Sequence, residues 1–142
     1  MNDFDFENFD KVWKGNALGQ SPKMSLRGGN AIDSLNKPPD FDRIRDNESD
    51  DYLKKNICGL SFLDMDSVKY YVPILARYAH RKYPDDSDNV IEDFLSLITS
   101  KRFIESSNQQ EKLSLSMLLT DFQKKKYRYR IADIIDTLQA KD

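Results

Sequence analysis

A stripe of apolar residues between positions 68 and 79 constrains the fold more than any other feature of the sequence. It consists of Val68, Tyr71, Val72, Leu75, Tyr78 and Ala79. These intervals of three and four residues place all six side chains on one face of an α-helix. Asp64 or Asp66 can cap its N-terminus, and Pro73 predicts a kink unless the regular helix begins only near Val72. We predict that this helix forms the centre of the core.

Three further helical patterns follow the stripe. The first runs from Asp88 to Ile98, the second from about Asn108 to Lys124, and the third through Ile131 to Leu138. Residues 1–60 are less regular: we expect a short helix near Phe6–Trp13, an extended segment or short strand at "KMSLR", a loop over 36–47 and a short helix that stops near Gly59. The fold class is therefore mainly α, a single-domain bundle of about four to six helices in which an irregular N-terminal third (1–60), with a possible short strand or hairpin, covers a helical core (61–142).

Composition limits the class of protein. A chain of 142 residues with 39% hydrophobic and 32% charged residues is typical of one globular domain. Its apolar runs are too short to span a membrane, and its first ten residues carry acids where a signal peptide needs bases. Because Cys58 is the only cysteine, no internal disulfide can form. We expect a cytoplasmic protein.

Residues suited to catalysis or metal binding are sparse. His80 is the only histidine, and its place at the polar end of a helix favours a solvent-facing side chain over a general base. A cysteine-dependent enzyme would need Cys58 to be an exposed, reactive thiolate. Asp85, Asp86 and Asp88 lack the frame of a calcium loop. We predict no enzyme activity, no cofactor and no metal site.

The string "SLRGGNAIDSL" at 25–35 combines two glycines with Arg27, Asn30 and Asp33. It lacks the longer glycine frame of a phosphate-binding loop. A tight turn explains Gly28 and Gly29 by their backbone freedom, and Asn30 can cap or adopt a left-handed conformation. We therefore favour a turn over a small-ligand site.

Two charged segments are candidate interaction sites. Six carboxylates lie between positions 40 and 51, interrupted by the apolar Phe41 and Ile44; they are Asp40, Asp42, Asp46, Glu48, Asp50 and Asp51. Such a segment can attract a basic partner and offer an apolar anchor, or it can be a solvated loop whose Phe41 packs on the core. The run "KKKYRYR" at 124–130 mixes bases with tyrosines, as in nucleic-acid binding, but the acids that flank it favour a solvated helix end.

Together, "SLRGGNAIDSL", the following "PP" and "YLKKNICGLSFLDMDSVKYYVPILARYA" resemble a bacterial family of small proteins of unknown function. The resemblance covers about residues 24–80 and implies a compact, mostly helical domain without implying an activity. Since Arg27, Asn30 and Asp33 belong to the recognisable string together with Gly28 and Gly29, we expect a hydrogen-bonded polar corner that joins Arg27 to Asp33 or to Asp64.

These features predict a non-enzymatic protein-binding module. Proteins of this size and style resemble immunity proteins, which bind and block a cognate toxin. We expect a toxin partner with a basic surface, contacted through the acids at 40–51 and those of the N-terminal segment, so that charge reversal at Asp42 and Asp46 weakens the complex. The alternative is a small nucleic-acid-binding regulator that uses 124–130. No membrane contact is expected.

Overall fold

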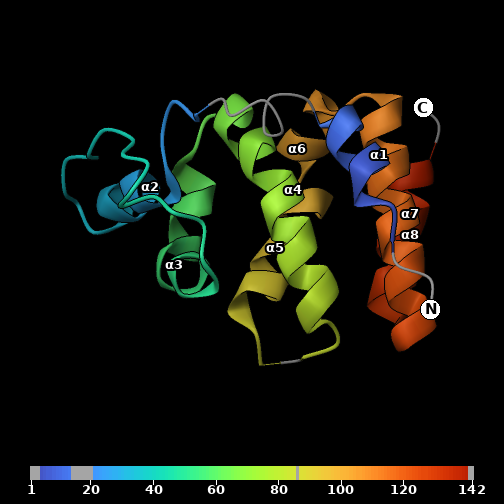
Figure 1. Ribbon diagram of the computed structural model, residues 1–142. Helices are drawn as coiled ribbons and strands as arrows, with labels where there is room; N and C mark the ends of the chain where they lie inside the picture. Colours follow the sequence, from blue (N-terminus) through green and yellow to red (C-terminus); the bar gives the residue numbers. More distant parts are fainter. Residues whose placement is uncertain (1–3, 14–20, 86, 141–142) are drawn as a thin grey trace.

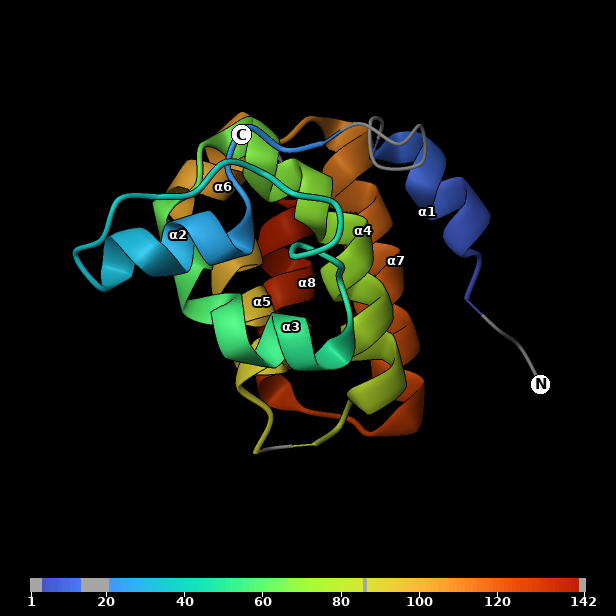
Figure 2. The ribbon, with the colours of Figure 1, turned by 60° about the vertical axis from the view of Figure 1, so that its left-hand side comes forward.

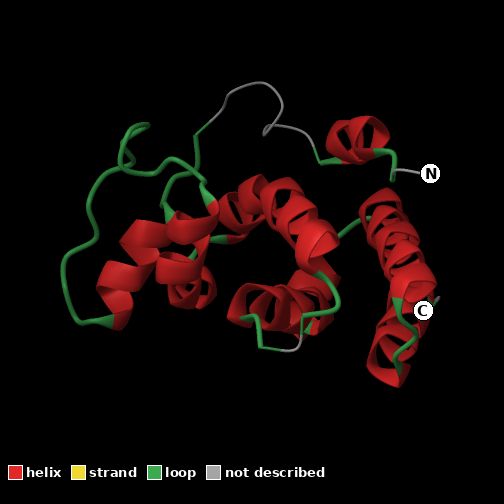
Figure 3. Cartoon of the chain, turned by 60° about the horizontal axis from the view of Figure 1, so that its bottom comes forward, coloured by secondary structure: helices red, strands yellow, loops and turns green. Residues whose placement is uncertain are grey.

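The computed structural model describes residues 4–13, 21–85 and 87–140, and within these ranges the chain forms eight α-helices, one 3-10 helix and no strand (Figure 1 and Figure 3). The helices are α1 (Phe6–Val12), α2 (Leu26–Asp33), α3 (Asp50–Asn56), the 3-10 helix η1 (Ile57–Phe62), α4 (Met65–Lys82), α5 (Asn89–Thr99), α6 (Lys101–Ser106), α7 (Gln109–Lys125) and α8 (Tyr129–Gln139). The mainly helical class is confirmed. The expected number of four to six helices was too low, because α2 and the short α6 were not predicted.

The apolar stripe forms the centre of the core, as predicted. All six of its residues are buried on α4, and the Asp64 carboxylate caps this helix by accepting from the Ser67 amide at 3.1 Å. Pro73 lies inside the helix and is buried. The three later helical patterns correspond to α5, α7 and α8. Asp88 caps the N-terminus of α5, and a capping box between Asn108 and Glu111 stabilises the N-terminus of α7.

The molecule has two sides that flank α4 and α5. We call residues 21–64 the N-terminal layer; it comprises α2, α3, η1 and their connections, and it lies on one side of α4 (Figure 1 and Figure 2). On the other side lie α1, α7 and α8 (Figure 1). Trp13 anchors α1 there: its indole is 1% exposed, and its Nε1 donates to Ser114 Oγ on α7 at 2.9 Å.

The structure corrects two predictions in the N-terminal layer. The segment "KMSLR" is not a strand, and Gly28-Gly29-Asn30 is not a turn: Ser25 caps α2, whose first residue is Leu26. A serine hydroxyl that accepts from the Gly28 amide at 2.9 Å starts the helix, and the two glycines continue it. The break expected at "GNALGQSP" falls mostly in residues 14–20, outside the described residues.

Candidate interaction surface

The segment from 34 to 49 that joins α2 to α3, here called the arm, is held in place by a buried carboxylate. Asp46 is 1% exposed, and both its oxygens are paired. Arg27 donates to it twice, from Nε to Oδ1 at 3.0 Å and from Nη2 to Oδ2 at 3.1 Å. The Tyr52 hydroxyl donates to Oδ1 at 2.7 Å and the Asp42 amide to Oδ2 at 2.8 Å. Burial favours a higher pKa for Asp46, but these donors outweigh it and its pKa is lowered.

Tyrosine hydroxyls connect this network to the start of α2. The Tyr52 hydroxyl accepts from the Arg27 amide at 3.1 Å, and the Tyr71 hydroxyl accepts from the Leu26 amide, also at 3.1 Å. Amides in the first turn of a helix have no partner within the helix, so these hydroxyls satisfy groups that burial would otherwise leave unpaired. Burial, and then the bond to Asp46, raise the pKa of Tyr52 to about 12.

The glycines of α2 allow a close approach to η1. A Cβ atom on Gly29 would lie 2.2 Å from the Gly59 carbonyl oxygen, and one on Gly59 would lie 2.2 Å from the Leu26 carbonyl oxygen. Both contacts are with backbone, which cannot move aside as a side chain can. At Gly28 the nearest atom is the flexible Met24 Cγ at 2.9 Å. Gly29 and Gly59 therefore permit backbone-to-backbone packing.

The polar corner exists, but its partners differ from those expected. Arg27 pairs with Asp46, not with Asp33 or Asp64. Asn30 donates from Nδ2 to Asn56 Oδ1 at 3.2 Å, while Asp33 is exposed at the end of α2. Since Asp46 and Asn56 lie 19 and 26 residues from their partners, sequence spacing could not identify these pairs.

The six acids at 40–51 do not share one role. Asp50 pairs with Arg81, and Glu48 accepts from the Tyr70 hydroxyl at 2.7 Å. Asp40 and Asp51 are exposed, and Phe41 is partly buried. Because the carboxylate of Asp46 is buried, charge reversal there would disturb the arm itself and could not by itself reveal a partner contact. Of the N-terminal acids, Asp5 caps α1 and Asp10 pairs with Arg77, while Asp3 lies outside the described residues.

Ile44 is presented to solvent by a turn that Asp42 builds. Asp42 Oδ1 accepts from the Ile44 amide at 2.9 Å and from the Arg45 amide at 3.1 Å. These backbone bonds, first that from Arg45, lower the pKa of Asp42. The Ile44 residue is 87% exposed between Arg43 and Arg45. Asp42 and Asp46 therefore shape the loop, and an apolar side chain stands at its turn.

Leu35 is a second large apolar residue of the arm, and it is 95% exposed. Its φ of 63° lies in the left-handed region. The Leu35 amide donates to the Ile32 carbonyl at 2.9 Å and the Asn36 amide to the Ala31 carbonyl at 2.8 Å, the bonding pattern of a Schellman helix end. Glycine is the usual residue at this position because L side chains are strained there. Leu35 therefore combines an unfavourable backbone conformation with nearly full exposure.

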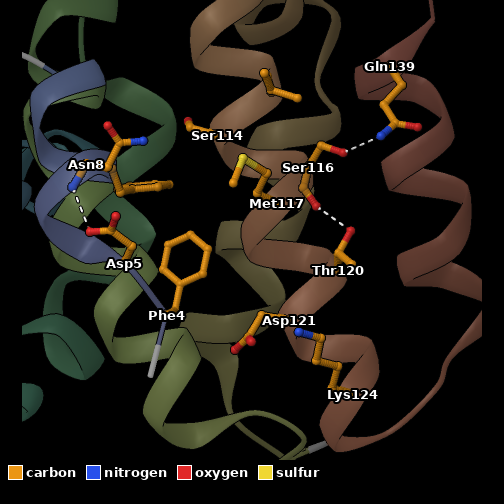
Figure 4. Close-up of a pocket in the computed structure, with 12 residues that line it drawn as sticks. Phe4, Asp5, Asn8, Ser114, Ser116, Met117, Thr120, Asp121, Lys124 and Gln139 are labelled. Atoms are coloured by element: carbon orange, nitrogen blue, oxygen red, sulfur yellow. Dashed lines mark hydrogen bonds between the residues drawn. The ribbon is translucent and has the colours of Figure 1, made fainter. Parts of the chain in front are cut away.

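A hollow lies between α1 and α7, with a volume of about 380 Å³. Figure 4 shows Phe4 and Asn8 on one side of it and Met117 and Asp121 on the other. On α7, Leu113 and Met117 are 55% and 52% exposed. This face is a weaker candidate for an interface than the arm, since its apolar residues are only half exposed.

The basic run at 124–130 joins α7 to α8, and much of it is engaged within the protein. Lys125 donates to the His80 carbonyl, and Arg128 donates to the Pro84 carbonyl at 2.7 Å. Arg130 pairs with Glu92 at 2.6 Å. Tyr127 and Tyr129 are 60% and 81% exposed, with ring centroids 5.5 Å apart.

The single histidine differs from expectation. His80 is not solvent-facing: its Nε2 lies 2.7 Å from Asp121 Oδ2, and Phe6 and Phe122 flank its ring. Cys58 lies elsewhere, exposed on η1. In the described part of the chain, no group of three or more His, Cys, Asp or Glu side chains is arranged to hold a metal ion. Within the same ranges, no helix has the length and apolarity needed to cross a membrane.

The chain belongs to a family of unknown function, DUF6714, whose model matches residues 7–128. The match extends from α1 through α7 and ends before α8 begins. No curated protein and no solved structure shows significant similarity to the chain. The family assignment agrees with the resemblance in the sequence and adds no activity to it.

Proposed function

We propose that this protein is a non-enzymatic protein-binding module that docks a partner through the arm. The observation that carries the proposal is the pair of nearly fully exposed apolar residues, Leu35 and Ile44, on a segment that is held in shape by the ion pair between Arg27 and the buried Asp46. Apolar residues in a preorganised surface segment are typical anchors of protein interfaces, because no ordering of the loop has to accompany binding.

The type of partner is a cognate toxin, which the protein binds and blocks as an immunity protein does. Two exposed acids near Ile44 in the sequence support this choice: Asp40 lies four residues before it and Asp51 seven residues after it. A toxin with a basic, partly apolar surface would complement them, and the exposed charges would speed association at low salt.

Co-expression with the product of the neighbouring gene tests the proposal. We expect a stable complex whose dissociation constant, measured by calorimetry, rises about tenfold in Ile44→Ser, as for loss of an interface anchor. Met117→Ser, which removes an exposed apolar residue on the opposite side, is the matched control and should bind as the unmodified protein does. Failure of the purified pair to associate at low salt would refute the proposal.

Nucleic-acid binding is the second candidate, and the exposed pair Tyr127 and Tyr129 favours it, since exposed rings beside bases can stack on unpaired nucleotides. Against it, three of the five bases in this run contact groups within the protein. Fluorescence anisotropy with a single-stranded oligonucleotide separates the two: absence of binding at about 50 mM salt removes this candidate.

A further inference from the structure

A groove whose lining includes Asp33, the residue that precedes the arm, has the chemistry of a site for a cation on an apolar stem. It has a volume of about 520 Å³ and lies between η1, the first turn of α4, and α5 with the segment that follows it. Its apolar walls are Ile57, Leu60, Met65, Val68 and Leu97. Such walls accommodate the methylene stem of a lysine or arginine, whose charged end then needs an acceptor.

Asp93 on α5 supplies that acceptor. Its side chain lines the groove and is partly buried, and none of the described residues donates a hydrogen bond to it or pairs with it. Burial, and to a lesser extent the neighbouring charge of Glu92, raise its pKa. The oxygens of this partly desolvated carboxylate reach solvent and have no partner among the described residues, so a cation that enters the groove can pair with them.

A second carboxylate reaches the groove from the other side. Asp33 is exposed and ends α2, where the helix dipole is negative and a carboxylate is unfavourable. The one cation of the lining is Arg102, whose Nη2 already donates to the Leu63 carbonyl at 2.8 Å. The charge of the groove therefore favours a positively charged occupant.

We propose that the groove receives a basic amphipathic segment of the partner protein, with a lysine or arginine directed at Asp93 and apolar neighbours against Leu60 and Leu97. This inference rests on the proposed function, since the partner that contacts the arm also supplies the segment. Asp33 and Leu35 are two residues apart, so one partner can reach both surfaces. The volume exceeds that of one lysine side chain, which is why we assign a segment and not a single residue.

The test uses the free protein and the amine 4-phenylbutylamine as the probe. Cys58 lines the groove and is the only cysteine, so its alkylation by neutral iodoacetamide, followed by mass spectrometry, reports occupancy. We expect saturable protection of Cys58 by the amine and none by 4-phenylbutanol at the same concentration. In Asp93→Asn the dissociation constant of the amine should rise about tenfold, as for loss of a charge-assisted hydrogen bond.

Two further variants complete the test. Asp136→Asn makes the same charge change on α8, away from the groove, and should leave protection unchanged. Ser96→Lys places an ammonium one helical turn from Asp93 and should abolish amine binding by occupying the site from within. Equal protection by the alcohol, or unchanged protection in Asp93→Asn, would overturn the proposal. Ile44→Ser should keep full protection, so failure of the arm and failure of the groove are distinguishable.

Discussion

The N-terminal layer and the helices α4, α5, α7 and α8 are stabilised by different physics. The helices bury regular apolar stripes, whereas the layer, which also buries residues such as Leu26 and Leu53, depends in addition on a buried Asp46 with four donors and on contact between the backbones of Gly29 and Gly59. Apolar burial is non-directional and tolerates small shifts, but hydrogen bonds and backbone contacts depend on position. The arm is therefore held by contacts that depend on position, and the layer is the part of the molecule that is more sensitive to small changes.

The largest expected effect is in the helical core. Phe94 on α5 is 0% exposed, and Phe94→Ala should lower the free energy of unfolding by about 4 kcal/mol through lost burial and a cavity. Urea denaturation followed by circular dichroism measures this. If the N-terminal layer depends on the helical core, the variant should also lose protection of the α2 amides in hydrogen exchange. Full protection of these amides would show that the layer and the helical core fold separately.

Gly29→Ala tests the backbone contact in the layer. Alanine favours a helix by about 1 kcal/mol over glycine, yet we expect a net loss of about 3 kcal/mol because the new Cβ meets the Gly59 carbonyl. Gly28→Ala is the matched control, since the one atom that its Cβ would crowd is Met24 Cγ, while the Pro39 carbonyl oxygen and Ser25 Oγ lie at an ordinary 3.5 Å; its stability should change by less than about 1 kcal/mol. Equal effects at both sites in thermal denaturation would contradict the close approach.

Arg27→Ala should cost about 2 kcal/mol, because it removes two donors from a buried carboxylate while two others remain. We place the value below that of a fully buried pair since the Arg27 side chain is 25% exposed. Hydrogen exchange should increase in the arm and in α2 before it increases in α4. A variant that keeps full stability but loses partner binding would make Arg27 a contact residue instead.

Lowering the pH should weaken the hydrogen-bond network around Asp46. The pKa of Asp46 is lower in the folded protein than in the unfolded chain, so its ionised form stabilises the fold. This contribution is present above the unfolded pKa and is lost as the pH falls below about 4 and through the folded value. The loss should be smaller than in Arg27→Ala, because Arg27 remains available to a protonated Asp46. In Asp46→Asn, denaturation curves between pH 5 and pH 2 should lack this component.

The smallest effect has the opposite sign. Leu35→Gly should raise the free energy of unfolding by about 1 kcal/mol, since glycine adopts the left-handed conformation without strain. The same change should weaken partner binding by removing an exposed anchor. Asparagine tolerates this φ better than leucine does, so the free energy of unfolding of Leu35→Asn should lie between those of the unmodified protein and Leu35→Gly. A partner affinity unchanged by Leu35→Gly would limit the interface to Ile44.

The sequence predictions were more accurate for the helical core than for the N-terminal layer. Periodicity identified α4, α5, α7 and α8, because their stability arises from faces that a helical repeat encodes locally. It failed at "LRGGNAID", where glycines suggested a turn, since the partners that make α2 a helix lie far along the chain at Tyr52, Gly59 and Tyr71. Ser25 was the one local signal of this helix, as an N-cap residue.

The sequence and the structure point to the same segment as a candidate interaction site, but for different chemical reasons. The segment at 40–51 stood out for its acids, and Ile44 was recognised within it. That Asp42 and Asp46 shape the loop depends on contacts across 4 to 19 residues, and the exposed Leu35 follows α2 with a left-handed backbone angle. Neither residue type nor spacing encodes these.

The sequence by itself determined the helical class, the central helix with an N-cap at Asp64 or Asp66, and the family to which the chain belongs. Only the tertiary structure decided that "LRGGNAID" is helical, that Asp46 is buried and that Asp93 has no partner among the described residues. The physical reason is the distance along the chain over which the interactions act. Caps and apolar periodicity act within a few residues, whereas the burial and pairing of a charge depend on groups that only the folded chain brings together.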